Sequence, residues 1–111
     1  MLAGNLDRRV TFERATATQS SPSGEQVLTW AEERSVWAQV EPLSGVELFR
    51  SQQLGAKVDT RFRIRWPGAS VEITPDETLR ILYEGRYYDI RSVVELGRRE
   101  GLEIMAEAAA D

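Results

Sequence analysis

The chain has 111 residues, a formal net charge of −4 and 41% hydrophobic residues, so we expect one domain (residues 1–111) with a small core. It contains neither cysteine nor histidine, which excludes disulfides, thiolate or imidazole metal sites, and Ser-His or Cys-His catalytic pairs. The acidic balance argues against a general nucleic-acid binder, whose affinity comes from neutralising phosphates.

The N-terminal part predicts short strands separated by a polar loop. Residues 8–14 alternate apolar and polar side chains, as a half-buried strand does. Residues 16–26 are rich in Ser, Thr, Gly and Pro and predict a mobile loop. Residues 26–30 and 35–41 predict two further strands, and Pro42 ends the second of them.

Residues 43–57 interrupt this β pattern and contain the best helix candidate. Ser44 and Glu47 have the spacing of a capping box, apolar residues follow at helical spacing, and Gly55 stands where such a helix would stop. Two interpretations remain open at this point. The segment is either a crossover helix that covers one end of a barrel, or a segment that docks on neighbours or changes conformation on assembly.

Residues 58–66 predict a strand with apolar residues facing inward and a ladder of arginines facing outward. The ladder consists of Arg61, Arg63 and Arg65. Like charges on one strand face repel each other unless acidic groups or phosphates meet them. Three interpretations follow: a solvated outer face balanced by nearby carboxylates, a subunit interface, or a contact with the DNA backbone.

Residues 79–107 predict a three-stranded β meander. Glu84 and Gly85 form the centre of a tight hairpin turn. Closing this turn places Tyr83 opposite Arg86, Ile81 opposite Tyr88 and Arg80 opposite Asp89, the last as an opposite-charge pair that helps to fix the register. Taken together, the elements predict a mostly β fold: a small antiparallel β-barrel or sandwich of about six strands, with one short helix or long loop after the third strand.

No group of residues in the sequence has the composition of a catalytic, metal or cofactor site, so we expect a non-enzymatic protein without cofactors. Asp76 and Glu77 are adjacent on a turn and point apart. Arg63, Arg65 and Trp66 support an alternative function, binding of single-stranded nucleic acid by a small β-barrel. No apolar run approaches the ~20 residues that cross a bilayer, and no signal-like stretch is present, so we expect cytoplasmic synthesis and no membrane contact.

The chain resembles the phage head–tail joining proteins, also called head-closure or stopper proteins. The resemblance covers most of the chain and is carried by ordered segments at fitting spacing: GNLDRRVTF at residues 4–12, VWAQVEPLSG at 36–45, the arginine strand at 61–65, ITPD at 73–76 and ILYEGRYYDI at 81–90. Gene-transfer agents, phage-like particles encoded in bacterial genomes, use similar proteins.

The resemblance implies a structural ring component of a head–tail connector that closes the DNA channel after packaging. Its implied partners are further copies of itself in a ring of six or twelve, a portal-side adaptor protein, and a tail terminator or tail-tube protein. Double-stranded DNA passes through the channel without tight binding. The protein would be made in the host cytoplasm and then reside at the head–tail interface of a virion or phage-like particle.

In such proteins a loop after the third strand projects into the channel as a gate, and residues 43–57 occupy the matching position. We expect the apolar side chains of this segment to divide between packing on a neighbour and plugging the channel. With the acidic Glu47 they form the candidate gate and subunit interface: Leu43, Val46, Glu47, Leu48, Phe49 and Leu54. The arginine ladder is a possible second interface.

Overall fold

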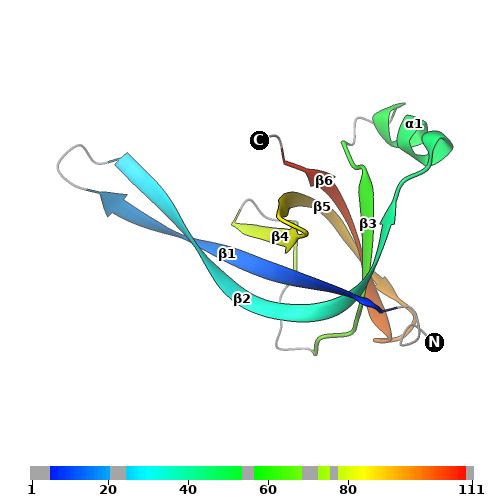
Figure 1. The fold of residues 1–111 in the computed structure, drawn as a ribbon, viewed down its shortest axis with the longest axis horizontal. Helices are drawn as coiled ribbons and strands as arrows, with labels where there is room; N and C mark the ends of the chain where they lie inside the picture. The colour runs from blue at the N-terminus through cyan, green and yellow to red at the C-terminus, as the bar shows by residue number, and fades with distance from the viewer. Residues whose placement is uncertain (1–5, 21–24, 54–56, 69–72, 76–77, 110–111) are drawn as a thin grey trace.

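The computed structural model describes residues 6–20, 25–53, 57–68, 73–75 and 78–109, and in this part of the chain six antiparallel strands close into a barrel (Figure 1). The order around the barrel is β1 (Arg8–Ser20), β2 (Glu25–Pro42), β3 (Thr60–Arg65), β6 (Gly101–Ala108), β5 (Arg86–Leu96) and β4 (Leu79–Tyr83). A short helix, α1 (Gly45–Gln53), lies between β2 and β3 in the chain. The mostly β prediction is confirmed, and of its two forms the barrel is correct.

The core fills the barrel with the inward residues of every strand, as the alternation predicts. Phe62 on β3 is fully buried, and its ring meets Tyr88 edge-on at 5.1 Å and Tyr83 at 6.2 Å between centroids. The other large buried side chains are Val10, Phe12, Ile64, Leu79, Ile81 and Ile104. Burying these side chains is the dominant stabilising contribution to the barrel.

The predicted β4–β5 hairpin is confirmed residue by residue. Tyr83 lies opposite Arg86 and Ile81 opposite Tyr88. Glu84 and Gly85 have φ angles of 51° and 77°, the left-handed values that a tight hairpin turn with matching twist requires. A local turn signal therefore fixed this register correctly.

Arg80 and Asp89 lie opposite each other, as predicted, but the carboxylate that Arg80 contacts belongs to another strand. Arg80 instead donates to Glu13 across the β1–β4 pairing, with 2.8 Å between Nε and Oε1. Its guanidinium lies over the rings of Trp30 and Tyr87, at 3.9 and 3.7 Å from their centroids. Barrel closure brings a better-shielded carboxylate within reach than the exposed Asp89.

The segments 26–30 and 35–41, predicted as separate strands, are parts of one strand, β2. The register with β1 slips by one residue at Phe12 and Glu13, which places Glu33 in a β-bulge. A bulge absorbs an extra residue and bends the strand without ending its pairing. As a consequence, α1 follows the second strand and not the third.

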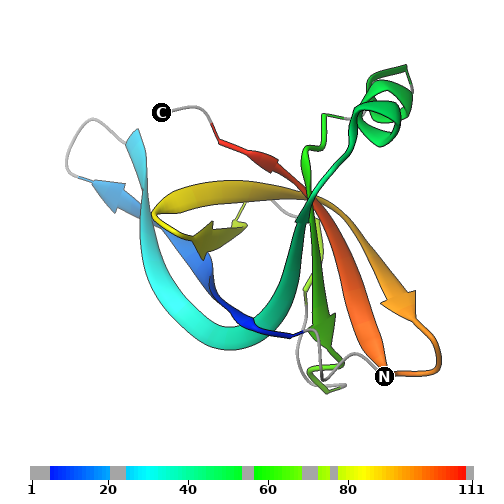
Figure 2. The ribbon, with the colours of Figure 1, turned by 45° about the vertical axis from the view of Figure 1, so that its right-hand side comes forward.

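The predicted loop over residues 16–26 is mostly strand as well. Residues 16–20 of β1 pair with residues 25–29 of β2, and residues 21–24 lie outside the described part of the chain. The paired segments form a two-stranded arm that extends from one side of the barrel, whereas α1 projects from another (Figures 1 and 2). The molecule is consequently elongated, with extents of 52 × 33 × 24 Å.

Ile73 is buried in the core without belonging to a strand. None of the described helices combines the length and the apolar character that a membrane crossing needs.

Candidate functional site

Helix α1 begins with the capping box that the sequence predicts. The Leu48 N–H donates to the Ser44 carbonyl at 2.8 Å, and the Ser44 hydroxyl donates to the Glu47 carboxylate at 3.3 Å. Glu47 also accepts a hydrogen bond from the Ser44 backbone N–H, which satisfies a donor that lies outside the helix ladder. The helix therefore starts at a defined residue, next to the end of β2.

The predicted apolar gate residues differ in their exposure. The side chains of Val46 and Phe49 are 65% and 59% exposed, whereas Leu43 and Leu48 are half-buried. Leu54 lies outside the described residues. The helix thus carries two large apolar side chains that the described part of the chain leaves exposed.

Arg61 on β3 connects the start of α1 to the barrel wall. Its guanidinium donates to Glu41 at the end of β2, with 2.8 Å between Nη1 and Oε1, and to Glu47 of α1. Its Nε lies 3.1 Å from Glu103 of β6 without forming a hydrogen bond. We call this set, Arg61 with Glu41, Glu47 and Glu103, the Arg61 clamp.

The charges of the Arg61 clamp stabilise one another. The hydrogen bond from Arg61 lowers the pKa of the exposed Glu47 carboxyl below its ordinary value. For Arg61, burial opposes the charged form, but the hydrogen bonds that it donates to Glu41 and Glu47 outweigh this effect and raise its pKa. Arg61 and Glu47 therefore favour each other's charged form, and the clamp joins three elements, β2, α1 and β6, to β3.

The rest of the arginine ladder divides between two environments. Arg63 pairs with Glu103, with 3.0 Å between Nη2 and Oε1, so the described part of the chain itself supplies carboxylates to Arg61 and Arg63. Arg65 is exposed at the end of β3 and has no carboxylate partner among the described residues. The interpretation as a balanced outer face thus fits two of the three arginines.

The aromatic residues do not form an exposed stacking row. Tyr88 belongs to the core, and Trp66 and Tyr83 pack against it. Trp37, at 54% exposed, and Tyr87 project into solvent, but on different strands. Among the described residues, no three acidic side chains converge in a way that could hold a metal ion.

The sequence matches the family of phage head completion proteins over residues 1–109. The chain belongs to this family. Membership gives it a structural role in the head and tail of a phage-type particle, and not that of an enzyme. This result confirms the resemblance found in the sequence.

Two solved structures share the fold. The solution structure of protein SF1141 from Shigella flexneri 2a is 28% identical, with a TM-score of 0.74 over 100% of this chain and 99% of that one. A chain from the virion of a native gene transfer agent particle is 22% identical, with a TM-score of 0.60 over 94% of this chain and 96% of that one. No curated protein matches the chain.

Sequence reasoning missed the carboxylates that complete the Arg61 clamp. Nothing in the linear sequence assigns Glu41 and Glu103 to Arg61. Glu103 lies directly opposite Arg63 in the β3–β6 pairing. The alternation of residues 61–65 and 101–106 places the charged side chains of both strands on the outer face. To pair them, one must also know that β3 lies beside β6, about 40 residues further along the chain.

Proposed function

We propose that the protein forms a ring between the portal-side adaptor and the tail of a phage-type particle, and that the segment 43–57 gates the DNA channel. Membership in the head completion family carries this proposal. The gate is assigned to the segment that leaves the barrel, because the barrel strands are committed to the core.

The exposed apolar side chains of α1 support the gate assignment. Val46 and Phe49 are large and solvent-exposed, and such residues on a projecting element mark an interaction surface more often than a chance arrangement. In a ring, copies of α1 brought together around an axis would bury these side chains against each other and narrow the channel.

The Arg61 clamp supports a gate that pivots on a fixed base. It fixes the first turn of α1 through Glu47, while no ion pair within the described residues holds the last turn, where Arg50 lies. The base would stay on β3 as the distal part of the segment changes its contacts. Acidic side chains around the base, Glu41, Glu47 and Asp59, would also keep DNA phosphates from adhering.

The two-stranded arm supports ring formation. An isolated hairpin is marginally stable in water, and this arm exposes Val27 and Leu28 near its tip. Contact with a neighbouring copy would cover these residues and stabilise the arm. The arm is therefore our candidate for contacts between ring subunits.

The gate is tested by DNA retention. Particles that carry Val46→Ser and Phe49→Ser should assemble and package DNA but release it, because both side chains are exposed and their loss leaves the barrel intact. A Val94→Ser variant, at another exposed valine on β5, is the matched control. Normal DNA retention in the double variant would contradict the gate assignment.

The ring is tested separately by mass. We expect the isolated protein to have the mass of a monomer. In a mixture with the portal-side partner, we expect the mass of a complex that contains six or twelve copies. A monomeric mass under both conditions would contradict the ring while leaving the family assignment intact.

A further inference from the structure

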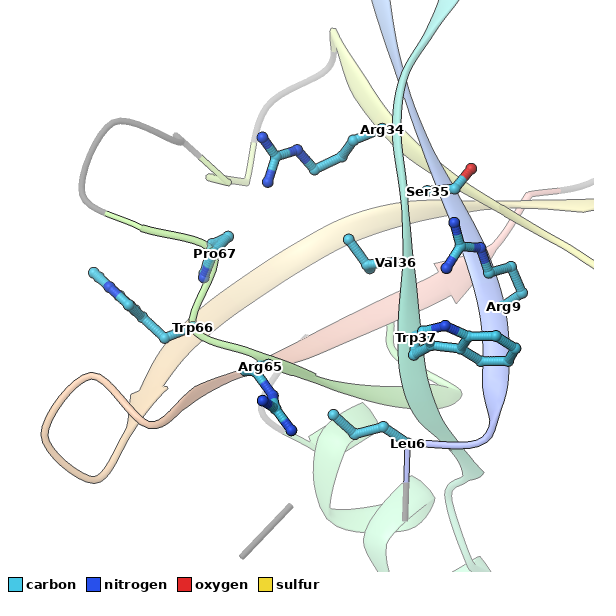
Figure 3. A pocket seen from close by; sticks show the side chains of 9 residues that line it. All are labelled: Leu6, Arg9, Arg34, Ser35, Val36, Trp37, Arg65, Trp66 and Pro67. Atoms are coloured by element: carbon cyan, nitrogen blue, oxygen red, sulfur yellow. The ribbon is translucent and has the colours of Figure 1, made fainter. Parts of the chain in front are cut away.

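A charged cleft lies where β2 and β3 diverge. The two strands pair from Ala38 to Pro42 of β2 and from Thr60 to Ile64 of β3. On the N-terminal side of Ala38, β2 pairs with β1 and leads toward the arm. On the C-terminal side of Ile64, β3 ends at Arg65 and the chain continues through Trp66 and Pro67. The cleft between them has a volume of about 520 Å³ and is lined by Leu6, Arg9, Arg34, Ser35, Val36, Trp37, Arg65, Trp66 and Pro67 (Figure 3).

The charge of this cleft differs from that of the rest of the barrel. Three of its lining residues are arginines, Arg9, Arg34 and Arg65, and none of its described lining residues is acidic. Within the described part of the chain, none of the three has a carboxylate partner. Five arginines elsewhere on the barrel do meet glutamates: Arg14, Arg61, Arg63, Arg80 and Arg91. An acidic protein thus keeps a local excess of positive charge at one site.

The cleft also offers apolar surface between its charges. Figure 3 shows Arg34 and Val36 extending from β2 toward the side where Trp66 and Pro67 lie, with Arg65 and Leu6 nearby. On the other side of β2, the guanidinium of Arg9 lies over the ring of Trp37, 5.2 Å from its centroid. A ligand with both carboxylates and an apolar side chain would match this lining.

The backbone of β2 adds a third recognition element. From Arg34 to Trp37 one edge of β2 pairs with β1, and the other edge faces the cleft without a partner among the described strands. An open strand edge presents unpaired N–H and C=O groups that an extended peptide can join. Every second side chain of such a peptide would point to the face that carries Arg34 and Val36, so a carboxylate and an apolar side chain two residues apart would meet both.

We propose that this cleft binds an extended acidic segment of a partner protein, which adds as a strand to the open edge of β2. Carboxylates of the segment pair with Arg34 and Arg65, and an apolar side chain packs on Val36 and Trp66. Arg9, held on Trp37, contributes positive charge at the rim. This inference does not depend on the gate, which lies on α1.

Peptide is favoured over nucleic acid for two reasons. A polynucleotide has no backbone groups that extend a β-sheet, so the open edge of β2 would gain nothing from it. A strand of phosphates also needs a long positive track, whereas this positive charge is confined to one cleft on a protein of net charge −4.

The experiment uses three fluorescein-labelled probes with the full chain: an eight-residue peptide of the repeat Asp-Asp-Leu-Leu, which places both residue types on each strand face, the same peptide with asparagine for aspartate, and an oligothymidylate of equal charge. We expect saturable binding of the acidic peptide by fluorescence anisotropy, at least tenfold tighter than the other two. Amides on the open edge of β2, within residues 34–37, should become protected from hydrogen exchange. The variant that carries Arg34→Gln and Arg65→Gln should lose at least tenfold in affinity, as expected for charge-assisted hydrogen bonds.

Arg86→Gln, at an exposed arginine in the β4–β5 hairpin outside the cleft, is the matched control and should bind as the unchanged protein does. Circular dichroism and the melting temperature should be the same for all variants, because none of these side chains is in the core. Equal binding of the asparagine peptide, tighter binding of the oligothymidylate, or no binding of the acidic peptide up to millimolar concentration would each overturn the proposal.

Discussion

The barrel and helix α1 are held in place by different kinds of interaction. The barrel buries a continuous set of aromatic and aliphatic side chains, whereas α1 leaves Val46 and Phe49 exposed and reaches the barrel through the Arg61 clamp. Apolar burial is insensitive to pH and salt, but partly exposed ion pairs are screened and titrate. A rigid frame and an adjustable appendage can thus coexist within 111 residues.

The apolar side chains of the two regions also differ in their surroundings. On β3 the apolar residues alternate with arginines, and their side chains are buried in the core. On α1, Val46 and Phe49 are exposed, and in the proposed ring they would be available to another subunit. Substitutions that treat the same residue type in both regions test this distinction directly.

The largest effect is expected from a matched pair of phenylalanine substitutions. Phe62→Ala removes a fully buried ring that contacts Tyr83 and Tyr88, and should lower the free energy of unfolding by about 3–5 kcal/mol. Phe49→Ala removes an exposed ring and should change it by less than about 0.5 kcal/mol. Urea unfolding followed by tryptophan fluorescence measures both, and a large loss at Phe49 would show that α1 packs on the barrel.

A smaller effect is expected from breaking the Arg61 clamp. Arg61→Gln leaves Glu41, Glu47 and Glu103 without their shared cation, and should cost roughly 1–2 kcal/mol of global stability. Amide exchange in the first turn of α1 should accelerate more than exchange in β3. Arg63→Gln, which removes a partner of Glu103 alone, is the control and should leave exchange in α1 unchanged. Uniform acceleration throughout the barrel would contradict a local clamp.

The sequence predicted best what is decided by neighbouring residues. The β4–β5 hairpin follows from the conformational demands at Glu84 and Gly85, and the start of α1 follows from Ser44 and Glu47. Both depend on contacts within a few residues, so a linear pattern contains the needed information. The alternation of buried and outward-facing residues around Phe62 is likewise a local pattern.

Features that depend on barrel closure were not predictable in this way. The partner of Arg80 is Glu13 because β1 lies beside β4, a pairing that joins distant parts of the chain. The polar residues around Glu33 predict a connection between two strands, but a β-bulge at this residue lets β2 continue as one strand. The cleft exists because the pairing of β2 with β3 begins only at Ala38, which leaves residues 34–37 of β2 apart from β3, and no local pattern marks that point.

Titration of Glu47 offers a finer test of the clamp. The hydrogen bond from Arg61 lowers the pKa of this carboxyl from its ordinary value of 4.5. The contact therefore contributes fully above about pH 4.5 and is lost as the pH falls through the lowered pKa. Carboxyl carbon shifts of Glu47, recorded by NMR between pH 6 and 2, should give a midpoint below 4.5 in the unchanged protein. Arg61→Gln should move the midpoint back up, and an identical midpoint in both proteins would mean that the clamp is not formed in solution.

The smallest expected signal is DNA binding by the unchanged protein. Its net charge is −4, and glutamates meet both Arg61 and Arg63, so a duplex should show negligible binding at about 150 mM salt. Replacing Glu41, Glu47 and Glu103 by glutamine removes three negative charges, which brings the net charge from −4 to −1, and exposes the two arginines. We expect this triple variant to bind DNA weakly at low salt and to release it as salt is raised. Tight, salt-resistant binding by the unchanged protein would favour the single-strand-binding alternative over a conduit that DNA crosses without adhering.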